Sequence, residues 1–132
     1  MKITLVEDNL GDVLLTKEIL EDIGLDYQLI TFQEGESAIQ YFEEISKENL
    51  GNSSPDLVIL DINLPQKSGL EILQFIRKKI PNPKFKIVFL TSSTASKDVA
   101  EIQRLQADGH FVKPLDPRLF KHFLSRYEEN LR

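Results

Sequence analysis

The stretch VILDINLP, residues Val58 to Pro65, decides the fold, because it ends a continuous apolar run on a carboxylate. Hydrophobicity without polar alternation predicts a strand that is covered on both faces, as in a parallel sheet. Asp61 follows that strand directly. A carboxylate at the end of a buried strand loses water and needs a partner, a metal ion or a proton. The stretch therefore predicts a parallel sheet with a charged site at its edge.

Outward from this stretch, the apolar runs predict five strands, at Ile3–Val6, Tyr27–Phe32, Leu57–Leu60, Ile87–Leu90 and His110–Val112. Between and after them, apolar residues three or four apart indicate helices. The stripes are Leu15, Ile19 and Ile23; Ala38, Ile39, Phe42 and Ile45; Ile72, Leu73, Ile76 and Ile80; Val99, Ile102 and Leu105; and Leu119, Phe120, Phe123, Leu124 and Tyr127. Strand followed by helix, five times, predicts an α/β fold with a parallel sheet and helices on both faces.

The composition is typical of one globular domain spanning residues 1–132, with 41% hydrophobic and 28% charged residues. The 21 acidic and 16 basic residues give a net charge of -5, which argues against DNA or an anionic membrane as a partner. Because the chain has no cysteine, a disulfide framework and a thiolate metal site are excluded. The apolar run after Met1 is too short for a signal peptide or a membrane span, so we expect a cytoplasmic protein.

Two long connections, Asn49–Asp56 and Lys79–Lys86, each precede a strand. We expect them at the amino edge of the sheet, whereas ligands of open α/β sheets bind beyond the carboxyl ends of the strands. The second connection overlaps a basic cluster, which we interpret as a solvated loop rather than a docking patch. It comprises Arg77, Lys78, Lys79, Lys84 and Lys86.

Polar residues follow four of the predicted strands where each strand ends. They are Glu7 and Asp8, then Asp61 and Asn63, then Thr91, Ser92 and Ser93, and finally Lys113. The carboxyl ends of parallel strands meet at one edge, so these side chains should converge there. Carboxylates about 4 Å apart repel by roughly 4 kcal/mol, which favours a hard cation such as Mg²⁺ among them. Each residue alone could be a turn residue, a cap or a surface amine, and their common position favours a site.

With VEDN, LDINLP, LTSS and VKP in this order, the chain resembles a response-regulator receiver domain of two-component signalling, from Lys2 to about Leu131. The resemblance implies a flavodoxin-like sheet of order 2-1-3-4-5 and Asp61 as the phospho-acceptor. It also implies that Lys113 and Thr91 contact the phosphoryl group. The implied cofactor is Mg²⁺, with Mn²⁺ as an alternative, held by Glu7, Asp8, Asp61 and the backbone carbonyl of Asn63.

The resemblance further implies a switch that catalyses only its own phosphorylation and dephosphorylation, and not a separate enzyme. The phosphoryl donor would be a sensor histidine kinase or a histidine phosphotransfer protein. The opening VEDNLGDVLLTKEIL resembles single-domain receivers that accompany phytochrome-type kinases. Asn63 lies two residues past the acceptor Asp61, and Ser93 lies two residues past the hydroxyl of Thr91. Both should tune hydrolysis of the aspartyl phosphate. Because the sequence stops one helix after Lys113, we expect no DNA-binding segment and an output through another, unnamed protein.

In the receiver family, the hydroxyl at the position of Thr91 moves together with an aromatic residue three positions before the lysine. Here that residue is His110, where Tyr or Phe is commoner. We consider two readings of it, a smaller rotor sensitive to pH and an exposed edge residue without a signalling role. His122 is expected to be solvated. The face formed by residues 97–106, 109–113 and 117–132 should bind targets or form a homodimer.

Three alternatives remain at this point. A haloacid dehalogenase-type phosphatase also uses an Asp nucleophile. It requires a second Asp two residues later, where this chain has Asn63, and it places the pair on its first strand, whereas Asp61 follows the third. A flavin-binding flavodoxin-like module would place phosphate where Glu7 and Asp8 repel it. A receiver retained only as a docking scaffold is disfavoured by the intact Asp61 and Lys113.

Overall fold

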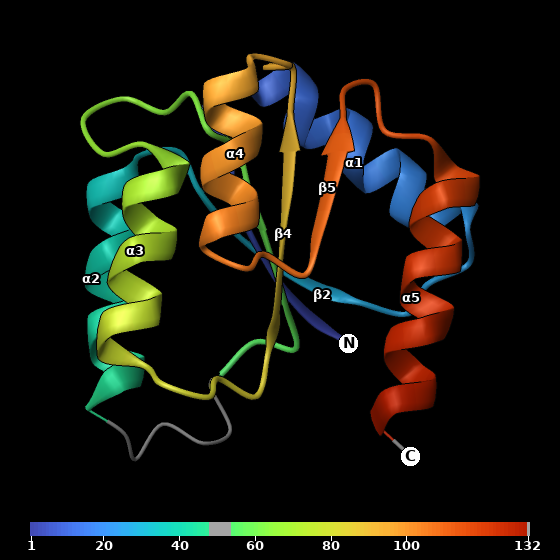
Figure 1. The fold of residues 1–132 in the computed structure, drawn as a ribbon. Coiled ribbons are helices and arrows are strands. Elements are labelled where there is room, and N and C mark those ends of the chain that lie inside the picture. The colour runs from blue at the N-terminus through green and yellow to red at the C-terminus, as the bar shows by residue number, and fades with distance from the viewer. Residues whose placement is uncertain (48–53, 132) are drawn as a thin grey trace.

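The computed structural model describes residues 1–47 and 54–131 (Figure 1). The described residues form one parallel sheet of five strands in the order β2-β1-β3-β4-β5. The strands are β1 (Lys2–Val6), β2 (Gln28–Phe32), β3 (Leu57–Leu60), β4 (Lys86–Thr91) and β5 (Gly109–Val112). This confirms the expected α/β fold and strand order. Most of the predicted Asn49–Asp56 connection, residues 49–53, lies outside the described residues.

The helices cover both faces of the sheet (Figure 1). They are α1 (Leu10–Asp22), α2 (Gly35–Ser46), α3 (Gly69–Lys79), α4 (Ser96–Arg104) and α5 (Pro117–Leu131). Helices α1 and α5 lie on one face, and α2, α3 and α4 lie on the other. Alternate residues of β3 enter separate apolar clusters, Leu57 and Ile59 on the α1–α5 side and Val58 and Leu60 on the other. The strand runs are continuously apolar because both faces are covered. None of the helices within the described ranges has the length and apolar character needed to cross a membrane.

Helix α1 buries a different stripe from the predicted one. Val13, Thr16 and Leu20 are buried, whereas Leu15 is 52% exposed. Ile19 and Ile23 are partly buried and pack against the core, so the predicted stripe was wrong at Leu15 and missed the buried residues. The Thr16 hydroxyl donates to the Asp12 carbonyl at 2.8 Å. Because this bond satisfies the hydroxyl, threonine can occupy a core position that a purely apolar pattern misses.

Helix α5 shows a smaller departure from the predicted stripe. Phe120, Leu124 and Tyr127 are buried, but Leu119 is 60% exposed. Consecutive residues of a helix point about 100° apart, so the burial of Phe120 turns its neighbour away from the core. The prediction that Leu119 belongs to the core was therefore wrong.

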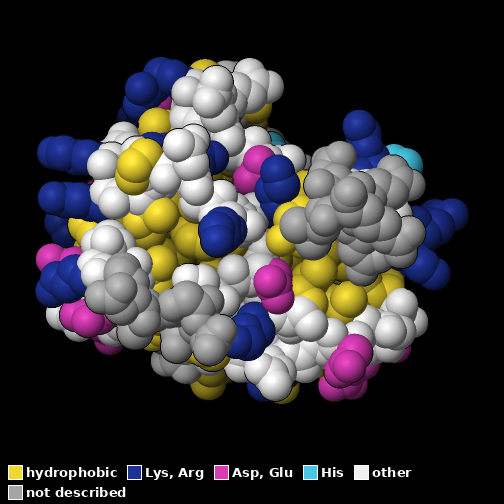
Figure 2. Space-filling view, turned by 90° about the horizontal axis from the view of Figure 1, so that it is seen from below, with side chains coloured by type: hydrophobic (Ala, Val, Ile, Leu, Met, Phe, Trp, Pro, Cys, Tyr) yellow, Lys and Arg dark blue, Asp and Glu magenta, His cyan; other side chains and the backbone are white. Residues whose placement is uncertain are grey.

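Two members of the basic cluster have structural partners, which corrects its interpretation as only a solvated loop. The Arg77 guanidinium donates to the carbonyls of Leu105, at 2.9 Å, and Gln106, at 2.7 Å, and so caps the end of α4. Lys86 lies 3.9 Å from Asp108. Figure 2 views the molecule from below, at the amino edge of the sheet, where side chains of both charges surround apolar surface.

Candidate functional site

The sheet itself brings the site residues together. The backbone N–H of Glu7 donates to Phe32 at 2.9 Å, that of Asp61 donates to Val6 at 3.1 Å, and that of Lys113 donates to Thr91 at 3.0 Å. Each bond extends the hydrogen-bond ladder just past the end of a strand. The side chains of Glu7, Asp61 and Lys113 therefore start from the same edge.

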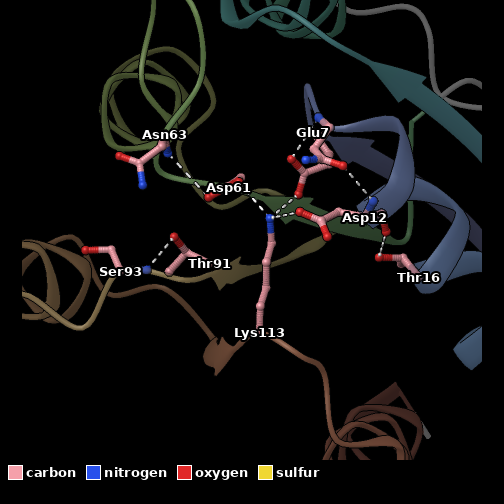
Figure 3. Close-up of polar contacts among 9 residues, drawn as sticks. Glu7, Asp12, Thr16, Asp61, Asn63, Thr91, Ser93 and Lys113 are labelled. Carbon is pink, nitrogen blue, oxygen red and sulfur yellow. Dashed lines mark hydrogen bonds and ion pairs between the residues drawn. The ribbon is translucent and has the colours of Figure 1, made fainter.

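The Lys113 ammonium stands at the centre of this edge (Figure 3). Its Nζ donates to Glu7 Oε1 at 2.6 Å, to Asp12 Oδ2 at 2.8 Å and to Asp61 Oδ2 at 2.9 Å. An ammonium has three N–H donors, so all of them are engaged, each in a charge-assisted bond. Glu7 is 2% and Asp61 6% exposed, which removes most of the water that would otherwise screen these charges.

Asp12 is the site residue that the sequence did not reveal. It lies in the first turn of α1, where an acidic residue is common because it complements the helix dipole. Asn9 caps this helix by accepting from the Asp12 N–H at 3.1 Å. An acid near a cap signals only a helix start, and the sequence does not show that this start faces the lysine of a distant strand.

An all-oxygen donor set lies beside the lysine. One carboxylate oxygen each from Glu7, Asp8 and Asp61 lies within 4.8 Å of the others, and this is a candidate cation site among the described residues. Asp8 is exposed, so the cluster opens to solvent. The Asn63 N–H donates to Asp61 Oδ1 at 3.3 Å and orients that carboxylate. Oxygen donors at the mouth of a buried acidic cluster fit a hard divalent cation.

The pKa values of two groups at this site, Glu7 and Lys113, depart from their ordinary values. Burial raises the pKa of Glu7 to about 7, and the nearby Asp61 charge adds to this rise against hydrogen bonds from Lys113 and Asn9. Burial alone would lower the pKa of Lys113, but its hydrogen bonds to Asp12, Glu7 and Asp61 outweigh that effect and raise it. Lys113 therefore stays charged at neutral pH, whereas Glu7 titrates there.

The turn after Asp61 is held by Gly69, whose role the sequence alone did not indicate. A Cβ on Gly69 would lie 2.0 Å from the Asp61 carbonyl oxygen. The Gly69 N–H donates to the Ile62 carbonyl at 3.0 Å. Ser68 and Glu71 then cap α3 reciprocally. Close packing of the start of α3 on the Asp61 backbone thus requires glycine at this position.

The hydroxyl residues after β4 connect the site to α4. Thr91 is fully buried, and its Oγ1 accepts from the Ser93 N–H at 3.2 Å. The Ser93 hydroxyl donates to Asp98 Oδ2, in the first turn of α4, at 2.6 Å. Ser92, by contrast, is exposed. Thr91 and Ser93 therefore link the carboxyl end of β4 to α4, which lies on the face of the sheet opposite to α1 and α5.

His110 lies on the edge strand β5 opposite Phe89 and is half-buried, so the expectation that it is exposed was wrong, and its role in signalling stays a prediction. Its Nε2 is, among the described residues, the buried side-chain polar atom without a hydrogen-bond partner. His122 is exposed, as expected.

The fold and this edge have counterparts in known proteins. The family model for the response regulator receiver domain matches residues 3–125. Response regulator Rcp1 of Synechocystis sp. is 32% identical over 84% of this chain and 75% of that protein. The structure of its Mn²⁺-bound form has 31% identity and a TM-score of 0.73, covering 92% of this chain and 88% of that one.

A second solved structure, of the phosphorylated cyanobacterial phytochrome response regulator RcpA, has 30% identity and a TM-score of 0.75. The likeness covers 96% of this chain and 91% of that one. These relatives set aside the dehalogenase-type and flavin-binding alternatives. The chain belongs to the response regulator receiver domain family, the signalling switches of two-component systems.

Proposed function

We propose that this chain is a phospho-accepting switch in which Asp61 takes a phosphoryl group from the phosphohistidine of a sensor kinase or a phosphotransfer protein. The observation that carries the proposal is the buried Asp61 carboxylate 2.9 Å from the Lys113 ammonium, within a cluster of acids. The phosphorylated form of the similar RcpA supports it.

Chemically, an Asp61 oxygen donates an electron pair to phosphorus while the bond from phosphorus to the imidazole nitrogen breaks, and that nitrogen keeps the pair. Both Asp61 oxygens accept a single hydrogen bond from the protein, from Asn63 and from Lys113, so each retains a lone pair for attack. Lys113 stabilises the charge of the transferring group. Water later hydrolyses the acyl phosphate, which returns the Asp61 carboxylate and releases inorganic phosphate.

The carboxylates of Glu7, Asp8 and Asp61, with the backbone carbonyl of Asn63, would hold Mg²⁺, or alternatively Mn²⁺. The separation of the three carboxylate oxygens, within 4.8 Å, supports this assignment. The Mn²⁺-bound form of the similar Rcp1 supports it as well. When bound, the ion supplies charge neutralisation to the phosphoryl oxygens.

Thr91 is the hydroxyl that we assign to the phosphoryl group. To reach it, the Thr91 side chain exchanges its bond from the Ser93 N–H for a phosphoryl oxygen. Ser93 is bonded to Asp98 on α4, so a rearrangement at Thr91 has a direct route to that helix. Asn63 and Ser93, two residues past Asp61 and Thr91, would tune the lifetime of the phosphorylated state.

The output surface would be the face of α4, β5 and α5. His110 lies in its central strand, and its buried Nε2 has no hydrogen-bond partner within residues 1–47 and 54–131, so we assign it the role of the moving ring. A rearranged face would then bind a protein target or a second copy of the chain. The likeness to Rcp1 and RcpA supports pairing with a phytochrome-type kinase. We further propose that residues 1–132 act as one cytoplasmic domain without direct binding to DNA or membranes.

The test is incubation with acetyl phosphate and Mg²⁺, followed by intact-mass measurement of wild type, Asp61→Asn and Asp22→Asn. Asp22 is an exposed acid at the end of α1 and serves as the matched control. We expect wild type and Asp22→Asn to gain one phosphoryl group and Asp61→Asn to gain none. Phosphorylation of Asp61→Asn would refute the acceptor assignment, and a gain by no protein would favour a docking scaffold.

A further inference from the structure

Asp12 differs from the other two acids that Lys113 contacts. Glu7 and Asp61 belong to the group of carboxylates whose oxygens lie within 4.8 Å of one another, and Asp12 does not belong to that group. Its Oδ2 nevertheless lies 2.8 Å from the Lys113 Nζ, a shorter distance than that from Asp61. Asp12 can therefore hold the Lys113 ammonium without also binding a cation in the carboxylate cluster.

A divalent ion in the cluster changes the balance of forces on Lys113. It draws the negative charge of Glu7 and Asp61 toward itself and repels the ammonium. Two of the three carboxylates that hold the Lys113 Nζ are weakened as partners at the moment when phosphoryl transfer needs a fixed cation. The charge of Asp12 is then the remaining strong attraction that the protein offers to the Lys113 Nζ.

The backbone of Asp12 is held on two sides. Its N–H donates to Asn9 Oδ1 at 3.1 Å, and its carbonyl accepts from the buried Thr16 hydroxyl at 2.8 Å. Its side chain is short and 31% exposed, and it leaves α1 in the direction of Lys113 (Figure 3). A carboxylate on a capped helix turn is preorganised to fix the end of a flexible four-carbon side chain.

We propose that Asp12 is a positioning residue that holds the Lys113 ammonium against the phosphoryl group when a cation occupies the carboxylate cluster. This inference rests on the proposed phospho-acceptor function of Asp61. The alternative is a simpler role, in which Asp12 only adds negative charge that repels an anionic phosphodonor. The two roles predict opposite changes when the charge of Asp12 is removed.

The first experiment measures the phosphorylation rate by acetyl phosphate at saturating Mg²⁺ for wild type, Asp12→Asn and Glu18→Gln. Glu18 is an exposed acid on the same helix, so its substitution removes an equal charge from α1 without touching Lys113. Asp12→Asn should lower the maximal rate about tenfold through misplacement of the ammonium, with the half-saturating donor concentration changed less than about twofold. Glu18→Gln should leave both values within about twofold of wild type. An unchanged or faster rate for Asp12→Asn would overturn the positioning role.

The second experiment needs no phosphorylation. Mg²⁺ affinity is measured by calorimetric titration for wild type, Asp12→Asn, Lys113→Ala and the double variant. Without its anchor, Lys113 competes more strongly with the ion for Glu7 and Asp61, so Asp12→Asn should raise the Mg²⁺ dissociation constant about fivefold. In the Lys113→Ala background the same substitution should change it by less than about twofold. Equal effects in both backgrounds would show that Asp12 acts by charge alone.

Thermal unfolding of each variant verifies that it is folded, and Asp12→Glu, which keeps the charge, should recover part of the lost rate. Absence of phosphorylation in wild type would count against the proposed function itself. Normal phosphorylation of wild type with an unaffected Asp12→Asn variant would remove only the positioning role.

Discussion

The acidic side chains at the two edges of the sheet have different kinds of partner. At the carboxyl edge, the acids Glu7, Asp12 and Asp61 share one ammonium, that of Lys113. At the amino edge, two acids, Asp56 and Asp108, each accept a backbone N–H. Asp56 Oδ2 accepts from Lys2 at 2.7 Å, and Asp108 Oδ2 accepts from Ile87 at 2.8 Å.

The amino edge therefore stabilises the fold, while the carboxyl edge retains repulsion among buried acids. The Asp56 carbonyl also accepts from the Tyr127 hydroxyl at 3.0 Å and from the Lys86 N–H at 3.1 Å, which joins α5 and β4 at one point. Hydrogen-bonded acids of this kind favour the native state. Crowded acids cost stability unless a cation or a proton neutralises them. Such a cluster of negative charge is suited to binding a metal ion beside the phospho-acceptor.

The largest effect should come from filling the space above the Asp61 backbone. In Gly69→Ala, the new Cβ would lie 2.0 Å from the Asp61 carbonyl oxygen, so the start of α3 must shift. We expect a loss of about 3 kcal/mol in the free energy of unfolding, measured by urea denaturation. Phosphorylation by acetyl phosphate should fall with it, because the shift displaces the acceptor.

Gly24→Ala is the control for this prediction. Gly24 has a φ of 77° but open space around its Cβ position, so the substitution costs only backbone strain. We expect a loss of about 1 kcal/mol and an unchanged phosphorylation rate. Equal destabilisation by the two substitutions would mean that the close approach to Asp61 has no special cost.

The next effect concerns pH and the acids of the carboxyl edge. Burial raises the pKa of Glu7 from 4.5 to about 7, so the folded state holds this proton more tightly than the unfolded state. The resulting stabilisation is fully present below pH 4.5 and is lost as pH rises through 7. Without metal, the free energy of unfolding should therefore fall across this window by on the order of 2 kcal/mol relative to Glu7→Gln.

Denaturation curves of wild type and Glu7→Gln at several pH values check this prediction. Saturating Mg²⁺ should reduce the fall in wild type, because the ion favours the ionised carboxylate. A wild-type curve parallel to that of Glu7→Gln, without metal, would contradict the raised pKa of Glu7.

The smallest effect belongs to the amino edge. Asp108→Ala leaves the buried Ile87 N–H without its side-chain acceptor and removes the partner of Lys86. We expect a loss of about 1 kcal/mol in the free energy of unfolding and no change in phosphorylation. Asp108→Asn, which retains an acceptor oxygen, should lose less. A slower phosphorylation of Asp108→Ala would show that the two edges are not independent.

Local patterns were enough to predict the strands, the helices and a parallel sheet, whereas the strand order followed from the resemblance to receiver domains. The runs at Leu57–Leu60 and Ile87–Leu90 are apolar at every residue, as expected for strands that are covered on both faces. Both lie in the sheet where they were predicted. The local patterns failed where the burial of a polar side chain depends on its hydrogen-bond partner. Thr16 is a core residue because of its hydroxyl bond to Asp12, and Arg77 is held by the carbonyls at the end of α4.

The candidate site divides in the same way. Glu7, Asp61 and Lys113 could be predicted to meet, because each directly follows a strand and parallel strands end at one edge. The roles of Asp12 and Gly69 could not, because they depend on how α1 and α3 approach that edge.

The sequence by itself determined the sheet, its covered strands and the acids at their ends, since these follow from periodicity along the chain. Only the tertiary structure decided that Lys113 shares its three N–H groups with Glu7, Asp12 and Asp61. It also decided that the Asp61 backbone lies too close to α3 for any residue but glycine at position 69. Both depend on distances between segments remote in the chain, which residue order does not encode locally.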